Sequence, residues 1–182
     1  HRFFKKLQEE GEIVRTGKAN QAHYVQAHAN TVQKIKSSTL VFHRILTNRN
    51  VTEDTVLKDI KQTTGIFLHI RKNIADILDY AFTEMLNNAV EHSRTEMIEV
   101  RMKRNPMNVR FEIIDWGIGI YRNIMQKRHL KSELEAIQDL LKGKETTAPK
   151  EHSGEGIFFT SKASDMLTIH GSKKRLIFNN LI

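Results

Sequence analysis

Glu84, Asn88 and His92 stand four positions apart, and each carries a side chain suited to chemistry at phosphate groups. A carboxylate can accept a proton as a general base. A side-chain amide oxygen can ligate a hard cation such as Mg²⁺. The imidazole either lines a phosphate site or caps the end of a helix, where a cation is favoured. In an α-helix a step of four residues drifts about 40° around the axis, so the three side chains form a ladder along one side.

The segment around this ladder predicts a helix from about Ile74 to Ser93, because its apolar residues recur at steps of three and four. Asn88 falls inside the apolar arc of that helix. Burying an unpaired amide or carboxylate costs about 1–3 kcal/mol, so the ladder needs partners. Neighbouring loops could satisfy it, or a ligand could. The apolar positions are Ile74, Ile77, Leu78, Ala81, Phe82, Met85, Leu86, Ala89 and Val90.

Two glycine-containing segments follow the predicted helix. Gly117 and Gly119 come directly after a strand pattern that ends at Asp115, and Gly154 and Gly156 come just before a helical pattern. Glycine permits tight turns and a close approach of the backbone to a ligand. Backbone amides at a glycine-rich helix N-terminus bind phosphate, and the helix dipole adds to the attraction. Each segment taken alone could also be an ordinary turn or loop.

The three motifs in this order resemble those of the Bergerat-fold ATPase superfamily, which includes gyrase, heat-shock chaperones, histidine kinases and mismatch-repair MutL. The resemblance covers roughly residues 50–180 and implies ATP and Mg²⁺ as cofactors. It also implies an α+β fold, a two-layer α/β sandwich. The motifs are Glu84-x-x-x-Asn88-x-x-x-His92, Asp115-x-Gly117-x-Gly119 and Gly154-x-Gly156-Ile157.

The resemblance also assigns roles to individual residues. Asp115 matches the aspartate that accepts a hydrogen bond from the adenine amino group, and Asn88 matches the magnesium ligand. Glu84 matches the carboxylate that activates water in hydrolysing members, or a substrate hydroxyl in serine-kinase members. The full set expected to bind ATP is Asn88, His92, Asp115, Gly117, Gly119, Ile120, Gly154, Gly156 and Ile157.

A charged stretch from Arg122 to His152 matches the ATP lid of this superfamily, a long segment of the kind that is often functional or mobile. It holds one helical patch, from Leu134 to Leu141. Its basic residues Lys144, Lys150 and His152 either approach phosphates when the lid closes or are solvated charges.

The sequence departs from the family pattern in three places. Trp116 occupies a position often held by a small or polar residue, and the stretch 173–178 lacks the Gly-Thr often seen near adenine in histidine kinases. The surroundings of His43 lack the context of a phosphoacceptor histidine, which argues against a self-phosphorylating sensor kinase. The nearest resemblance is to stand-alone modules, including anti-sigma-factor serine kinases that act on STAS-domain antagonists.

The first 29 residues are similar to the end of a winged-helix DNA-binding domain, with a helix stopped at Gly11 and two short strand-like runs. A basic hairpin packed on the ATPase domain is the alternative. Residues 30–52 read as a linker or extension and residues 53–182 as the ATP-binding domain. The residues expected to contact DNA phosphates are Arg2, Lys5, Lys6, Arg15 and Lys18.

Downstream patterns complete the α+β prediction. Thr52 is placed to cap a helix, and residues 98–103 and 109–113 alternate as an antiparallel hairpin. Two further strand-like runs lie at 166–170 and 175–178. Helices mixed with antiparallel strands indicate two layers rather than a parallel sheet.

Bulk composition narrows the function classes. The 182 residues carry a net charge of +8, which favours anionic partners such as nucleotides or nucleic acid. The absence of cysteine excludes disulfides and thiolate metal sites. No apolar run approaches the roughly 18 residues of a membrane span, and no signal peptide is visible. The lack of cysteine fits a cytoplasmic location, which is the expected one. His1 in place of Met suggests an excised fragment.

The sequence as a whole predicts a magnesium-dependent, ATP-gated transcriptional or signalling regulator with weak ATPase activity. Two alternatives stay open. One is a protein serine/threonine kinase acting on a STAS-like partner, and the other is a nucleotide-gated binding module without catalysis.

Overall fold

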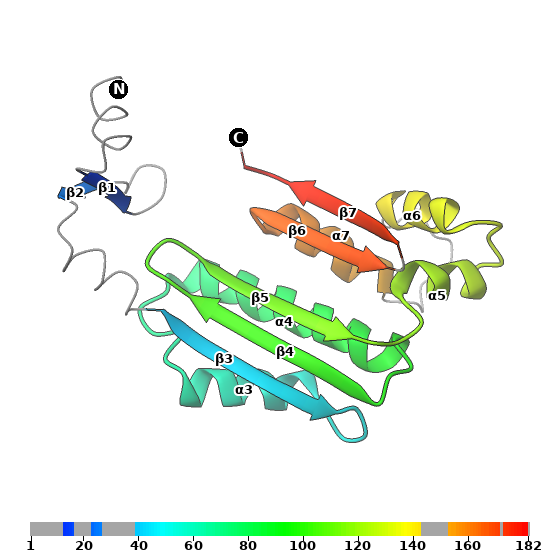
Figure 1. Cartoon of the computed structure of the whole chain (residues 1–182), viewed down its shortest axis with the longest axis horizontal. Helices are drawn as coiled ribbons and strands as arrows, with labels where there is room; N and C mark the ends of the chain where they lie inside the picture. The colour runs from blue at the N-terminus through cyan, green and yellow to red at the C-terminus, as the bar shows by residue number, and fades with distance from the viewer. Residues whose placement is uncertain (1–12, 17–22, 27–38, 143–152, 172, 182) are drawn as a thin grey trace.

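The computed structural model describes residues 13–16, 23–26, 39–142, 153–171 and 173–181 (Figure 1). Several residues singled out by the sequence therefore lie outside the described ranges. They are Arg2, Lys5, Lys6, Lys18, Lys144, Lys150 and His152.

A three-stranded antiparallel sheet with helices on one face forms the larger part of the fold. Its strand order is β3–β4–β5, formed by Leu40–Thr47, Met97–Arg104 and Val109–Asp115. Two helices, α3 (Glu53–Thr63) and α4 (Lys72–His92), lie behind this sheet in the view of Figure 1. This arrangement confirms the predicted α+β class.

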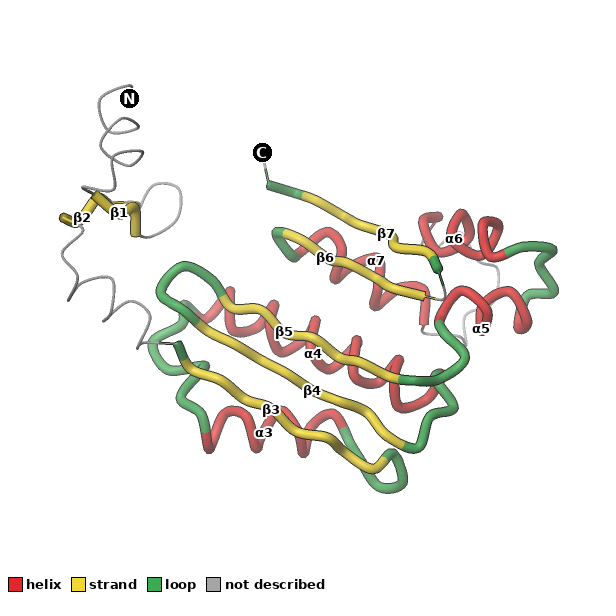
Figure 2. The backbone as a smooth tube through the Cα atoms, in the orientation of Figure 1, coloured by secondary structure: helices red, strands yellow, loops and turns green. Residues whose placement is uncertain are grey.

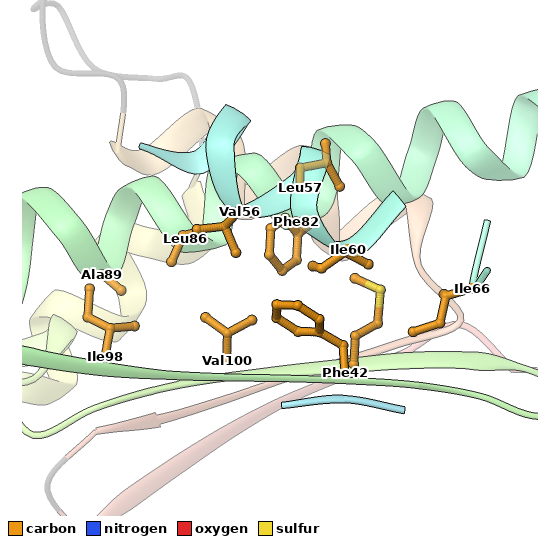
Figure 3. Close-up of a cluster of buried hydrophobic side chains, with 11 residues drawn as sticks. Phe42, Val56, Leu57, Ile60, Ile66, Phe82, Leu86, Ala89, Ile98 and Val100 are labelled. Carbon is orange, nitrogen blue, oxygen red and sulfur yellow. The ribbon is translucent and has the colours of Figure 1, made fainter. Parts of the chain in front are cut away.

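Strand alternation explains how this sheet and its helices share one core. Met102, in the central strand, faces Phe42 on one side and Phe111 on the other, and all three point toward the helices. Phe82 of α4 meets Phe111 edge-on, with ring centroids 5.5 Å apart. Figure 3 shows the helix side chains meeting those of the sheet. The core residues are Phe42, Val56, Leu57, Ile60, Ile66, Phe82, Leu86, Ala89, Ile98, Val100 and Met102.

A second cluster of elements follows β5 along the chain. It comprises α5 (Ile120–Lys127), α6 (Glu133–Lys142), α7 (Ser153–Ala163) and the antiparallel pair β6 (Met166–Gly171) and β7 (Lys174–Asn179), traced in Figure 2. Its own core is formed by Tyr121, Ala136, Leu140 and Ile157. The Tyr121 hydroxyl donates to the Ile169 carbonyl at 3.0 Å. Helix α7 packs along α4, which joins the two clusters.

Local signals read from the sequence agree with most element boundaries. The Thr52 hydroxyl accepts a hydrogen bond from Thr55 N at 3.4 Å and so caps α3. The backbone turn between β4 and β5 is closed by the Asn105 side chain, which accepts from Met107 N and Asn108 N at 2.8 and 2.9 Å. The predicted helical patch is α6.

Three elements differ from the sequence reading. Residues 40–47, within the stretch read as a linker or extension, form the edge strand β3 because Phe42 turns into the core. Helix α5 lies in the stretch where only α6 was anticipated. Helix α7 begins at Ser153, so Gly154 and Gly156 lie inside its first turn rather than before it.

Two short strands near the N-terminus, β1 (Ile13–Thr16) and β2 (His23–Gln26), pair antiparallel. They agree with the two strand-like runs predicted there. None of the described helices is both long and apolar enough to cross a membrane.

Candidate functional site

Helix α4 carries the predicted ladder on the side that other elements approach. Glu84, Asn88 and His92 are each partly buried. The Asn88 Nδ2 atom is buried without a hydrogen-bond partner among the described residues. A buried amide left unpaired is costly, so this donor calls for a partner such as an ordered water or a ligand. The His92 ring lies 3.7 Å from the Glu91 carboxylate.

The first turn of α7 lies directly against Glu84. A Cβ atom added at Gly156 would lie 1.9 Å from the Glu84 Oε2 atom and 2.8 Å from its Cδ atom. Only glycine therefore leaves room for the carboxylate at this position. The contact places the Glu84 side chain beside a helix N-terminus, where unpaired backbone amides and the helix dipole favour anions.

Tyr80 is a candidate site residue that the sequence alone did not single out. It lies one turn before Glu84 on α4. Burial raises the pKa of the Tyr80 phenol, and the nearby Glu84 and Glu155 carboxylates raise it further. Like any tyrosine near neutral pH, the phenol is protonated and can act as a donor. Its spacing of four from Glu84 extends the ladder by one step and could have revealed it.

The end of β5 leads into a turn that is fixed by Asp115. The Asp115 Oδ1 atom accepts a hydrogen bond from Gly117 N at 3.0 Å. Its other carboxylate oxygen makes no hydrogen bond within the described residues. The partly buried Asp115 can thus hold its own turn and still accept from a ligand. Trp116, the departure from the family pattern, is exposed.

The same turn is pressed onto the C-terminal end of α4. A Cβ atom at Gly117 would lie 1.8 Å from the Ser93 carbonyl oxygen, which accepts from Ile118 N at 2.9 Å. Asn123 of α5 donates from its side chain to the His92 carbonyl at 2.7 Å. These contacts fix the turn relative to the ladder.

Helix α5 starts from an unusual backbone conformation. Gly119 has a φ of 78°, in the left-handed region that favours glycine, and Ile120 is the first residue of the helix. The Gly119 carbonyl accepts from Asn123 N at 3.0 Å. The second glycine of the motif is thus required by the geometry of the turn.

The structure brings the two glycine motifs to two points along α4. One contacts Glu84 and the other contacts Ser93, nine residues later and about 14 Å along the helix axis. Asn88 lies between these points. The sequence-predicted residues Gly154 and Ile157 belong to α7, where Ile157 is buried in the second core and supports the first turn.

The donor set fits a nucleotide-bound magnesium ion better than a metal held by protein alone. Within the described ranges, no group of three or more His, Asp or Glu side chains is arranged to hold a metal ion. Mg²⁺ commonly takes one or two protein ligands and completes its shell with phosphates and water. The side-chain oxygen of Asn88 is of the type that Mg²⁺ takes, whereas its partnerless Nδ2 atom is a donor suited to a phosphate oxygen.

A comparison with protein families gives a match over most of the chain. The histidine kinase-like ATPase domain matches residues 35–178, from before β3 to one residue short of the end of β7. The chain therefore belongs to the histidine kinase-like ATPase family, a family of ATP-binding domains. Neither the curated proteins nor the solved structures give a match.

Proposed function

We propose that the protein is a regulatory module that binds ATP with Mg²⁺ along the C-terminal half of α4, and that Glu84 promotes phosphoryl transfer. The observation that carries the proposal is the seating of the Glu84 carboxylate against Gly156, in the first turn of α7. A general base and a phosphate-binding helix terminus are thereby adjacent. Membership of the ATPase family supports the choice of nucleotide.

The adenine end of the site is formed by the turn after β5. Asp115 accepts a hydrogen bond from the adenine amino group with the carboxylate oxygen that its own turn does not use. Gly117 keeps this turn close to α4 because no side chain separates it from the Ser93 carbonyl. The contacts of Asn123 and Ile118 hold the arrangement rigid.

The phosphate end is formed by α7 and the ladder. Backbone amides in the first turn of α7, including those of Gly154 and Gly156, donate to phosphate oxygens. Asn88 would hold Mg²⁺ through its side-chain oxygen, and the bound ion would supply neutralisation of the phosphate charge. His92 either adds a contact at this end or caps α4.

Glu84 accepts the proton of the attacking oxygen, which belongs to water or to a hydroxyl of a partner protein. The new bond forms to the γ-phosphorus as the bond to the bridging oxygen breaks, and ADP leaves with the electron pair. The protonated Tyr80 phenol acts as a neighbouring donor that orients the carboxylate. Tyr80 is in this sense a positioning residue.

The fate of the γ-phosphate separates the possible activities. Purified protein is incubated with Mg²⁺ and γ-labelled ATP, and the label is followed into free phosphate, protein or neither. Free phosphate identifies an ATPase, labelled protein a kinase such as the anti-sigma-factor type, and unchanged ATP a binding module. Glu84→Gln should retain nucleotide binding and lose turnover by roughly a hundredfold or more.

Asp76→Asn is the matched control, because Asp76 is an exposed carboxylate on the same helix. It should leave both binding and turnover unchanged. Equal turnover in Glu84→Gln and the parent would remove the base role. Loss of ATP binding in Glu84→Gln would instead assign the residue to the magnesium shell or to folding.

Binding of duplex DNA by the N-terminal segment is a second candidate, favoured by the antiparallel pairing of β1 and β2. Arg15 lies in β1, as expected for a wing, and the other proposed DNA contacts lie outside the described residues. DNA affinity that falls steeply with salt, with a slope reduced by roughly one unit in Lys18→Ala, would support it. Absence of DNA binding at low salt would leave a partner protein, such as a STAS-like one, as the regulated target.

A further inference from the structure

The outer face of the β3–β4–β5 sheet is not covered by any described helix, and it faces the viewer in Figure 1. Because side chains alternate along strands, the residues opposite the core point to this face. In β3 they include Val41 and Ile45, which are 52% and 56% exposed. An edge strand with exposed aliphatic side chains is a surface that favours contact with another chain.

A buried carboxylate organises the centre of this face. The Glu99 side chain is only 8% exposed although no described helix covers it. His43 donates to Glu99 Oε1 at 2.7 Å from the strand on one side. Arg101 donates to the same oxygen from Nε at 2.6 Å and from Nη2 at 2.5 Å. The side chains at the centre of this face are thus held in place by hydrogen bonds and form a platform around Glu99.

Beside this platform, two cations oppose each other in register. Lys103 of β4 pairs directly with Arg110 of β5. Arg110 forms an ion pair with Glu112 at 2.5 Å, but Lys103 makes none with the described residues. Like charges opposite each other on neighbouring strands are destabilising. The arrangement would be relieved by an anionic group placed between them.

A shallow pocket lies at this point, with a volume of about 110 Å³, lined by Arg101, Lys103, Arg110 and Glu112. Across the strands, Val41 stands opposite Lys103 and so borders the same row. The row therefore offers an aliphatic surface, then an ammonium group, then a guanidinium group. Its chemistry suits a ligand with a carboxylate next to apolar side chains.

We propose that this outer face binds an acidic, partly aliphatic segment of a partner protein, with a carboxylate placed between Lys103 and Arg110. The segment's aliphatic side chains lie on Val41 and Ile45. This surface is on the side of the sheet opposite to α4 and its ladder. A partner can therefore be held while the proposed nucleotide site stays open.

A protein segment fits the face better than a nucleic acid does. The exposed Val41 and Ile45 offer apolar contact that a phosphate backbone does not use. Glu112 lines the pocket beside the two cations and would repel a continuous row of phosphates. One carboxylate can sit between Lys103 and Arg110 while its neighbours avoid Glu112.

The test is an NMR titration of the isotopically labelled chain without nucleotide, using a short peptide of alternating Glu and Val. Amide shifts should change along β3, β4 and β5. Lys103→Glu should weaken binding on the order of fivefold or more, because it places a like charge where the carboxylate enters. A peptide of alternating Lys and Val should not bind there.

Lys58→Glu is the matched control, since it makes the same charge change at an exposed position of α3 in the opposite layer. It should bind the acidic peptide as the parent does. Lys103→Met removes the charge but keeps an unbranched side chain, so it should also weaken binding. It serves as the test variant if Lys103→Glu does not fold. The proposal would be overturned if the Lys58 and Lys103 changes weakened peptide binding equally. It would also be overturned if the peptide changed amide shifts only in elements other than β3, β4 and β5. Tighter binding of a short DNA duplex to the same face would overturn it as well.

Discussion

The two carboxylate oxygens of Asp115 differ in their contacts. One oxygen holds the turn by accepting from Gly117 N, and the other makes no hydrogen bond within the described residues. An asparagine could keep the first contact with its carbonyl oxygen. It would then present an NH₂ group where an adenine amino group needs an acceptor.

Asp115→Asn should therefore weaken ATP binding by about 1–3 kcal/mol while leaving the fold intact. Guanine presents a carbonyl oxygen in place of the adenine amino group, so GTP should lose less affinity than ATP. Calorimetric titration of both nucleotides into parent and variant measures the difference. If Asp115→Asn lost as much affinity for GTP as for ATP, Asp115 would not contact the purine amino group.

Residue types alone did not single out every residue of the candidate site. Glu84, Asn88 and Asp115 were predicted because a helical step of four and a strand end are local patterns. Tyr80 has the same spacing, but an aromatic side chain on an amphipathic helix is usually a core residue. Its relation to Glu84 and Glu155 arises only when α7 packs along α4.

At the scale of the elements, the two motifs need glycine for different physical reasons. Gly117 faces a backbone carbonyl, that of Ser93, which cannot move without shifting the end of α4. Gly156 faces the far end of the flexible Glu84 side chain. The first glycine is therefore needed for the fold and the second for the placement of one carboxylate.

Gly117→Ala and Gly156→Ala should consequently separate stability from activity. Gly117→Ala should lower the free energy of unfolding by roughly 1–3 kcal/mol, as overpacking does. Gly156→Ala should change it little, because a helical alanine gains about 0.5–1 kcal/mol over glycine and offsets the local crowding. Only Gly156→Ala should leave a stable protein in which turnover falls because Glu84 is displaced.

Denaturant unfolding and phosphate release on both variants decide this prediction. A well-folded Gly117→Ala protein would show that the contact with Ser93 is looser than the distances imply. A fully active Gly156→Ala protein would show that Glu84 can move away from α7 without loss of function.

The strands of the larger sheet were not equally predictable from the sequence. The hairpin of β4 and β5 alternates cleanly, so both strands and their turn were predicted. Strand β3 was read only as part of an extended stretch because Val41 and Ile45 are apolar on its exposed face. Strict alternation, the usual strand signal, is lost when the outer face is also apolar.

Helix α5 was missed for a related reason. It has only eight residues, and charged side chains flank its apolar ones in a stretch interpreted as a lid. Tyr121 is nonetheless fully buried, against a position where Gly171 leaves room for its ring. That close approach is a tertiary contact and leaves no local trace in the sequence.

On the scale of the molecule, the sheet separates two environments. Its inner face is an apolar core with α3 and α4, and its outer face carries a network of charges around Glu99. Burial alone would raise the pKa of the Glu99 carboxyl group. The hydrogen bonds from Arg101 and His43 outweigh burial, so the pKa of Glu99 lies below its ordinary value of 4.5.

This shift links the outer face to the stability of the whole fold. A carboxylate whose pKa is lower in the folded state contributes stability above its unfolded pKa, near 4.5. The contribution is lost as the pH falls through the folded value. The parent should therefore lose stability on acidification below about pH 4.5, in part through protonation of Glu99.

Glu99→Gln should be less stable than the parent at neutral pH, and the difference should shrink as the solution becomes acidic. Glu96→Gln, a change at an exposed carboxylate that makes no ion pair with the described residues, should follow the parent at every pH. Urea unfolding of the three proteins from neutral pH to about pH 3 measures the effect. A constant gap between Glu99→Gln and the parent would mean that Glu99 acts through packing alone. A gap that closes on acidification would show that the ionised Glu99 carboxylate stabilises the sheet. The face proposed to bind a partner would then also support the fold around the proposed nucleotide site.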